Sequence, residues 1–269
     1  MGSRFGGDKQ FTALGPHGET LMDYAVFDAA RAGIERVVLI VRPDALPLLP
    51  ALQARYRSTV DLTAASQRLD DLPAGWSPPA GRTRPWGTSQ AIWATRHMVD
   101  SPFIVVNGDD FYGAAPYHAL VEARRHEPTE WHLAGFRLRD TLSPSGPVNR
   151  AICAVDANGF LTALEEVRGI VTPLDGDAVV SMNMWGLTPD VFAIIEDGFT
   201  RFLRDADLAR DEYYLPEAIA EAMARGRKVR VLPAGSRWCG VTFPGDAPAV
   251  REQLAALAAR NEYPAPLWP

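Results

Sequence analysis

Cysteine is scarce in this chain, which has only Cys153 and Cys239 among its 269 residues. The two lie far apart, and neither belongs to a CxxC pair or a mixed Cys/His pattern. This scarcity excludes a disulfide scaffold and a cysteine-rich zinc site. We expect two buried free thiols that pack as small apolar side chains, in a protein of a reducing compartment.

Long apolar runs are also missing. The longest are short, such as residues 37–41 (VVLIV), far below the roughly 18–20 residues that a membrane-spanning helix needs. No basic and apolar signal segment opens the sequence. These features predict a cytoplasmic protein that has no membrane partner.

Positive charge is not in excess, because 27 basic side chains face 33 acidic ones and the net charge is −6. That balance disfavours broad binding to nucleic acid or to an anionic membrane surface. The five histidines have no metal-ligand spacing. We expect the histidines at surface or turn positions.

What the sequence does contain is an ordinary globular composition, 47% hydrophobic and 22% charged. Strand-like and helix-like segments alternate over the first half, which favours a parallel sheet covered by helices. Strands are expected at 36–41, 60–65, 103–107, 131–137, 150–155, 160–165, 179–186 and 228–232. Helices are expected at 20–32, 44–56, 88–98, 116–125, 189–197, 215–225 and 247–260. We predict one α/β domain over residues 1–269, with a Rossmann-like, doubly wound, mostly parallel sheet and a C-terminal α/β portion.

The first segment with a chemical pattern is 2–10, GSRFGGDKQ. Closely spaced glycines let backbone N–H groups approach an anion, and Arg4 and Lys9 would offset the charge of a polyphosphate. The segment matches neither the phosphate loop of the P-loop proteins nor a dinucleotide fingerprint. A solvated N-terminus with incidental basic residues is the alternative interpretation.

Two further segments lie next to predicted elements. Asp109 and Asp110 follow the buried strand 103–107, where ligands bind in open α/β sheets, and Mg²⁺ prefers oxygen ligands that it shares with substrate phosphates. Residues 86–91, WGTSQA, form a glycine turn into a helix that can read a nucleobase edge. The alternatives are an aspartate pair that caps a turn and an ordinary helix N-cap at Thr88 or Ser89.

Taken together, these segments resemble the sugar-nucleotidyltransferase superfamily, in particular its glucose-1-phosphate thymidylyl- and uridylyltransferase-like members. The resemblance covers nearly the whole chain, with its motifs in the family's order. They are GSRFGGDKQ (2–10), WGTSQA (86–91), VNGDDFYG (106–113), Glu165-Glu166, SMNMWG (181–186), EYYLP (212–216) and SRWCGVT (236–242).

The resemblance implies transfer of a nucleoside monophosphate from an NTP to a phosphorylated acceptor, with release of pyrophosphate and with Mg²⁺ as cofactor. Residues 1–135 would bind the nucleotide, with UTP or CTP slightly favoured, and residues 136–269 the acceptor. The implied roles are catalysis by Arg4 and Lys9, nucleotide binding by Gly2, Ser3, Gln67, Gly87 and Thr88, metal binding by Asp109 or Asp110, and acceptor binding by Glu166 and Asn183.

The chain departs from the family pattern in three places. Family members carry a strand before the signature loop, so a true start upstream of Met1 is expected, the alternative being a compromised product. No aspartate follows Trp238 where a second metal ligand is usual, and Asp246 is the nearest carboxylate. Val167 stands where a lysine that binds the acceptor normally follows the paired glutamates.

Some questions stay open at this level. Arg137, Arg139 and Arg150 flank the loop 140–149, either to hold an acceptor phosphate or as solvated charges. A catalytically weak nucleotide-binding or regulatory protein of the same fold is the main alternative to an enzyme. A nicotinamide-dependent oxidoreductase is disfavoured, since Arg42 stands where an acidic residue is needed.

Overall fold

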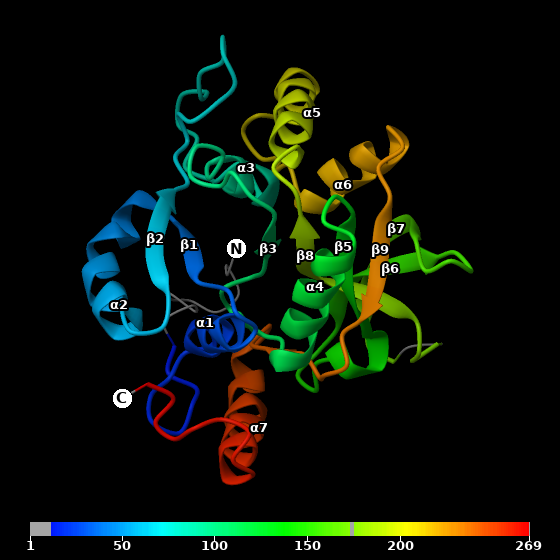
Figure 1. Cartoon of the computed structure of the whole chain (residues 1–269). Helices are drawn as coiled ribbons and strands as arrows, with labels where there is room; N and C mark the ends of the chain where they lie inside the picture. The colour runs from blue at the N-terminus through cyan, green and yellow to red at the C-terminus, as the bar shows by residue number, and fades with distance from the viewer. Residues whose placement is uncertain (1–11, 173–174, 269) are drawn as a thin grey trace.

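The computed structural model describes residues 12–172 and 175–268, and Figure 1 shows their arrangement. The helices are α1 (Leu21–Arg31), α2 (Leu49–Tyr56), α3 (Thr88–Trp93), α4 (Ala114–His126), α5 (Val191–Asp205), α6 (Leu215–Ala224) and α7 (Ala247–Ala259). The strands are β1 (Arg36–Val41), β2 (Asp61–Ser66), β3 (Phe103–Val105), β4 (Asp110–Phe111), β5 (Trp131–Arg137), β6 (Val148–Val155), β7 (Leu161–Ile170), β8 (Val179–Leu187), β9 (Val229–Pro233) and β10 (Cys239–Gly240).

Local signals explain the first elements. Helix α1 begins at a capping box in which Thr20 and Asp23 satisfy each other's backbone N–H groups. It ends at Arg31 with Ala32 as its C-cap, and Gly33 follows with φ +87°, a conformation that glycine adopts without strain. The apolar run of β1 then pairs in parallel with β2, in the register Arg36↔Asp61.

The main sheet is mixed rather than mostly parallel. Its six strands include the path β7-β6-β8-β5-β9, and β3 pairs with β8. Strand β8 runs antiparallel to β3, β5 and β6, whereas β5–β9 and the separate pair β1–β2 are parallel. The α/β class is confirmed, and the doubly wound arrangement stays a prediction. The apolar run of β8 did not indicate its direction, since buried parallel and buried antiparallel strands have similar sequence patterns.

Several predicted boundaries shift. The helix expected at 88–98 ends at Trp93, whereas the one expected at 189–197 continues to Asp205 as α5. Helix α5 is long because its apolar residues recur at helical spacing, at Val191, Ile195, Phe199 and Leu203, and all are buried. The short pair β4–β10 was not predicted, because two-residue strands carry no periodicity.

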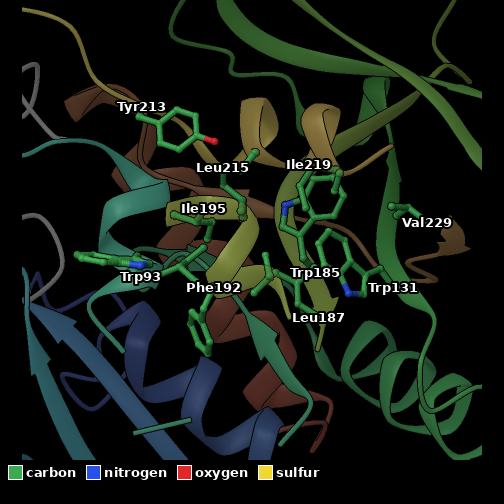
Figure 2. Close-up of a cluster of buried hydrophobic side chains, with 14 of the residues drawn as sticks. Trp93, Trp131, Trp185, Leu187, Phe192, Ile195, Tyr213, Leu215, Ile219 and Val229 are labelled. Atoms are coloured by element: carbon green, nitrogen blue, oxygen red, sulfur yellow. The ribbon is translucent and has the colours of Figure 1, made fainter. Parts of the chain in front are cut away.

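Two hydrophobic cores cover the two faces of the central strand β8. Trp185 and Leu187 lie in the core formed with α3, α5 and α6, whereas Met182 and Met184 lie in the core formed with α4. Side chains of a strand alternate between faces, so β8 is buried on both sides. Figure 2 shows Trp185 together with Trp131 and Ile219 in the first of these cores.

The C-terminal segment packs against α1 at one end of the molecule, next to α7 (Figure 1). The Tyr263 hydroxyl donates to the buried carboxylate of Asp28 at 2.8 Å, and the Leu267 N–H donates to Glu19 at 3.1 Å. Both cysteines are buried and free, as predicted. Within the described ranges, no helix is long and apolar enough to cross a membrane.

Candidate functional site

The predicted site residues fall into three groups in the structure. Gln67, Gly87 and Thr88 lie where β2 ends and α3 begins, Asp109 lies in the turn before β4, and Asp110 is the first residue of β4. The predicted acceptor residues lie on β7 and β8. Those from the glycine-rich segment lie outside the described residues, namely Gly2, Ser3, Arg4 and Lys9.

Gly87 lies in close contact with the segment before α6. It has φ +102°, and a Cβ built on it would lie 2.4 Å from the carbonyl oxygen of Tyr213. The Tyr213 N–H donates to Trp86 O at 2.7 Å, and the Leu215 N–H donates to Thr88 Oγ1 at 2.8 Å. Gly87 therefore permits an approach that any side chain would block, and the Thr88 hydroxyl helps hold the two segments together.

The N-terminus of α3 also settles an alternative. Gly87 is its N-cap residue, and no side chain caps the helix. The interpretation of Thr88 or Ser89 as an ordinary N-cap is therefore wrong. The helix begins at a glycine because the segment has to pass against the Tyr213 backbone.

Gln67 is held by a chain of hydrogen bonds that fixes the orientation of its amide. The fully buried Gln90 donates from Nε2 to the carbonyl oxygens of Arg68 at 3.0 Å and Asp71 at 3.2 Å. Its Oε1 is therefore an acceptor, which receives Gln67 Nε2 at 2.9 Å. Gln67 Nε2 also donates to Gly87 O at 2.9 Å. Because both amide hydrogens are used, Oε1 is the atom of Gln67 left to accept from a nucleobase.

The loop that carries the two aspartates leads directly into the short ladder β4–β10. Asp110 is buried, accepts from Asn107 Nδ2 at 2.9 Å, and pairs across the ladder with Gly240. A Cβ on Gly240 would lie 2.7 Å from Asp110 Oδ1 and 2.6 Å from the ring of Trp238. Position 240 thus faces Asp110 directly, and its glycine adds no carboxylate beside Asp110.

Asp246 does not replace that carboxylate. Its Oδ1 accepts from Ser143 Oγ at 2.6 Å, and its Oδ2 accepts from the N–H groups of Thr242 at 3.0 Å and Phe243 at 2.8 Å. Burial raises the pKa of Asp246, but these hydrogen bonds outweigh it and leave the pKa below its usual value. Asp246 therefore caps a turn, and the described residues contain no group of three or more His, Cys, Asp or Glu side chains that could hold a metal ion.

The Asp109–Asp110 pair still fits Mg²⁺, since this ion is commonly held by one or two carboxylates together with substrate phosphates and water. Asp109 is half-buried in the turn before β4. A magnesium ion at this pair would depend on the nucleotide for much of its coordination.

Tyr112 connects the aspartate loop to β8. Its hydroxyl is fully buried, accepts from the Asn107 N–H at 3.0 Å and donates to Met182 O at 2.9 Å. Asn183, which follows Met182 in β8, has φ +59° and lies beside a register shift in the β5–β8 ladder. Such a conformation in a non-glycine residue is held by surrounding contacts and is common at functional sites. The predicted acceptor residue Asn183 is thereby joined to the predicted metal loop.

Glu166 lies farther out on β7 and is more exposed. It pairs with Ala151, which pairs in turn with Ser181 of β8, two residues before Asn183. Glu166 also lies close enough to the segment before α6 that its charge helps, after burial, to raise the pKa of Tyr214. Glu166 thus lies on an exposed part of β7, one strand beyond the β6 neighbour of β8 and near the start of α6.

Three residues with a part in this arrangement escaped the sequence analysis: Gln90, Tyr112 and, as a position, Gly240. A polar residue on the buried face of the helix 88–98 was the available signal for Gln90. The motif SRWCGVT had shown that no aspartate follows Trp238, but the pairing of Gly240 with Asp110, which is distant in sequence, was not predicted.

Arg150 is not a solvated charge, which was one of the two interpretations that the sequence left open. Arg137 and Arg139 are exposed and share Asp177, whereas Arg150 is buried between the loop 140–149 and Trp238. Burial lowers the pKa of its guanidinium to about 10.

No protein-family model and no curated protein matches this sequence. Among solved structures, the chain is similar to an inositol-1-phosphate CTP transferase from T. maritima, with a TM-score of 0.63 and 15% identity over 90% of this chain and 84% of that one. It is also similar to HddC from Yersinia pseudotuberculosis, with a TM-score of 0.57 and 15% identity over 91% of this chain and 89% of that one. With the ordered motifs, these likenesses show that the chain has a sugar-nucleotidyltransferase-like fold.

Proposed function

We propose that this protein is a nucleotidyltransferase that moves a nucleoside monophosphate from an NTP to a sugar phosphate or similar phosphorylated acceptor and releases pyrophosphate. The observation that carries the proposal is the Tyr112 hydroxyl, which joins the Asp109–Asp110 loop to the strained backbone at Asn183. The loop of the candidate metal ligands and the strand of the candidate acceptor contact are thus linked through one buried hydroxyl.

In this reaction an acceptor phosphate oxygen attacks the α-phosphorus of the NTP, a new P–O bond forms, and the bond to the β-phosphate breaks. The protein has little covalent work to do, so its residues position the two substrates and offset charge. Gln67 would accept from the base, with its amide held by Gln90. Asp109 and Asp110 would hold Mg²⁺, which lowers the repulsion between phosphates. Arg4 and Lys9 keep their predicted roles on the phosphates.

CTP is the nucleotide to test first. Sequence reasoning favours UTP or CTP, and the T. maritima neighbour is named as a CTP transferase. The experiment measures pyrophosphate release with Mg²⁺ for each common NTP against a panel of sugar 1-phosphates and phosphorylated alcohols. Release with one pair of substrates, weakened in Asp110→Asn at limiting Mg²⁺, supports the proposal, and a folded chain that releases no pyrophosphate with any pair contradicts it.

A nucleotide-binding protein without transfer activity is the second candidate. Gly240 favours it, because the position that faces Asp110 carries no carboxylate. Nucleotide binding measured by calorimetry, without pyrophosphate release from any acceptor in the panel, would select this candidate.

A further inference from the structure

Arg150 is a buried cation that has no carboxylate partner within the described part of the chain. Its side chain lies on β6, and the residue is 9% exposed. Nε donates to Thr141 Oγ1 at 3.1 Å, Nη1 donates to Asn149 O at 2.8 Å, and Nη2 donates to Thr141 O. All three acceptors are neutral, and no described carboxylate lies within 4.0 Å of the guanidinium.

Burying an arginine in this way costs folding free energy, which a purely structural role would have to offset. Taking a full charge out of water is unfavourable unless an opposite charge or excellent hydrogen bonding compensates it. The charges of Asp110 and Asp246 act on Arg150 through space, but neither forms an ion pair with it. The chain therefore maintains a desolvated positive charge near one end of the candidate metal loop.

Trp238 lies between that charge and Gly240. The Arg150 guanidinium carbon lies 5.0 Å from the centre of the Trp238 ring. The same ring and Asp110 Oδ1 both approach the bare Cα of Gly240, at 2.6 and 2.7 Å from where a Cβ would be. Arg150, Trp238 and Asp110 thus form a contiguous row, in which one indole ring separates the cation from the candidate metal ligand.

The strand register gives a second, independent observation. Arg150 and Val167 are direct partners in the antiparallel ladder β6–β7. Directly opposite residues present their side chains on the same face of a sheet. Val167 stands where the family resemblance implies a lysine, and Arg150 lies on the same face of the sheet, supplied by the neighbouring strand.

We propose that Arg150 binds the phosphate group of the acceptor, a phosphomonoester dianion, beside the Asp109–Asp110 pair. Three of its five N–H groups are used by Thr141 and Asn149, which leaves one on each terminal nitrogen. Two such donors suit a bidentate contact with two phosphate oxygens. The inference rests on the proposed function for the identity of the acceptor, but the binding of phosphate itself does not.

The test uses the full chain and inorganic phosphate as the probe, with binding measured by calorimetry and folding checked by circular dichroism. Arg150→Met is expected to weaken phosphate binding by about tenfold or more, because two charge-assisted hydrogen bonds are lost. The affinity for CTP should change less than about twofold, as expected for a site at which the nucleotide has no contact. The matched control is Arg139→Met, an exposed arginine next to the same loop, for which phosphate binding is expected to stay as in the unaltered protein.

A rescue separates a binding role from a structural one. Val167→Lys, added to Arg150→Met, places an ammonium group across the ladder and is expected to restore most of the phosphate affinity. A purely structural arginine would not be rescued in this way, since its role would lie in the three hydrogen bonds that its guanidinium makes to Thr141 and Asn149. If Arg150→Met does not fold, Arg150→Lys provides the test, because it keeps the charge but loses the two-pronged contact and is expected to weaken phosphate binding about fivefold.

Unchanged phosphate binding in a folded Arg150→Met or Arg150→Lys variant would overturn the proposal, and so would an unaltered protein that binds no phosphate. The outcome is distinguishable from that for the proposed function. Phosphate binding that depends on Arg150, without pyrophosphate release, would contradict only the transferase. Pyrophosphate release with an unchanged acceptor KM in Arg150→Met would contradict only the role of Arg150.

Discussion

The amide nitrogen of Gln67 lies 2.9 Å from Oε1 of Gln90, a completely buried side chain whose own amide is anchored by two backbone carbonyls. The contact leaves Gln67 Oε1 as the free acceptor at the end of β2. A residue that touches no predicted ligand thereby decides which polar atom a nucleobase would meet.

Replacing Gln90 by methionine is expected to raise the KM for the NTP and to narrow the difference in kcat/KM between NTPs, because the Gln67 amide can then turn over. It should also cost about 1–3 kcal/mol of stability, since the carbonyl oxygens of Arg68 and Asp71 lose their donor. Steady-state kinetics and urea unfolding measure the two effects. Gln53→Met is the control, because Gln53 donates to Leu62 O near the start of β2, away from the Gln67 end, and should leave the KM unchanged.

Gly87→Ala is expected to destabilise the protein by more than about 2 kcal/mol, since the new methyl group meets the Tyr213 carbonyl and the backbone has φ +102°. The midpoint and slope of urea unfolding give the change. Gly81→Ala, at φ +83° with no atom within 4 Å of the new Cβ, isolates the backbone contribution and should cost about 1 kcal/mol. Equal losses in the two variants would show that the contact with Tyr213 is unimportant.

Tyr112→Phe removes the hydroxyl that joins Asn107 and Met182. We expect a loss of about 1–3 kcal/mol, because a buried carbonyl loses its donor and a backbone N–H loses its acceptor. The KM for the acceptor should rise more than that for the NTP, since the backbone before Asn183 is released. Tyr117→Phe is a matched control: Tyr117 is as deeply buried, but its hydroxyl has no hydrogen-bond partner in the described structure, so its removal should be nearly neutral.

Asp110→Asn is expected to raise the Mg²⁺ concentration needed for half-maximal pyrophosphate release by about tenfold or more, because a charged oxygen ligand becomes neutral. The measurement is a magnesium titration at fixed substrate concentrations. Asp246→Asn should lower thermal stability without changing the magnesium requirement, since Asp246 caps a turn. A magnesium requirement that shifts in Asp246→Asn instead would contradict this division of roles.

Local sequence signals were reliable where neighbouring residues decide the structure. Strand β1 was predicted with the bounds that the structure has, and the helix expected at 20–32 is α1, Leu21–Arg31. The buried cysteines were also predicted, since small apolar side chains favour the interior. The order of motifs pointed to the fold that the solved structures share.

The remaining features depend on partners that lie far away in the sequence. Asp246 was the nearest carboxylate along the chain to the missing metal ligand, but its oxygens face a turn and Ser143. Nothing in the sequence separated Arg150 from Arg137 and Arg139, and its burial beside Trp238 and its bonds to Thr141 distinguish it in the structure. No pattern of neighbouring residues in the sequence predicts such contacts.

By itself, the sequence determined the α/β class, most of the elements and the residue types available for phosphate and metal chemistry, because these follow from periodicity and short-range hydrogen bonding. Tertiary structure alone decided the antiparallel direction of β8, the meeting of Asp110 with Gly240, and the fixed amide of Gln67. Each of these joins segments separated by 20 or more residues. Such contacts form only when hydrophobic burial on both faces of the sheet brings those segments together.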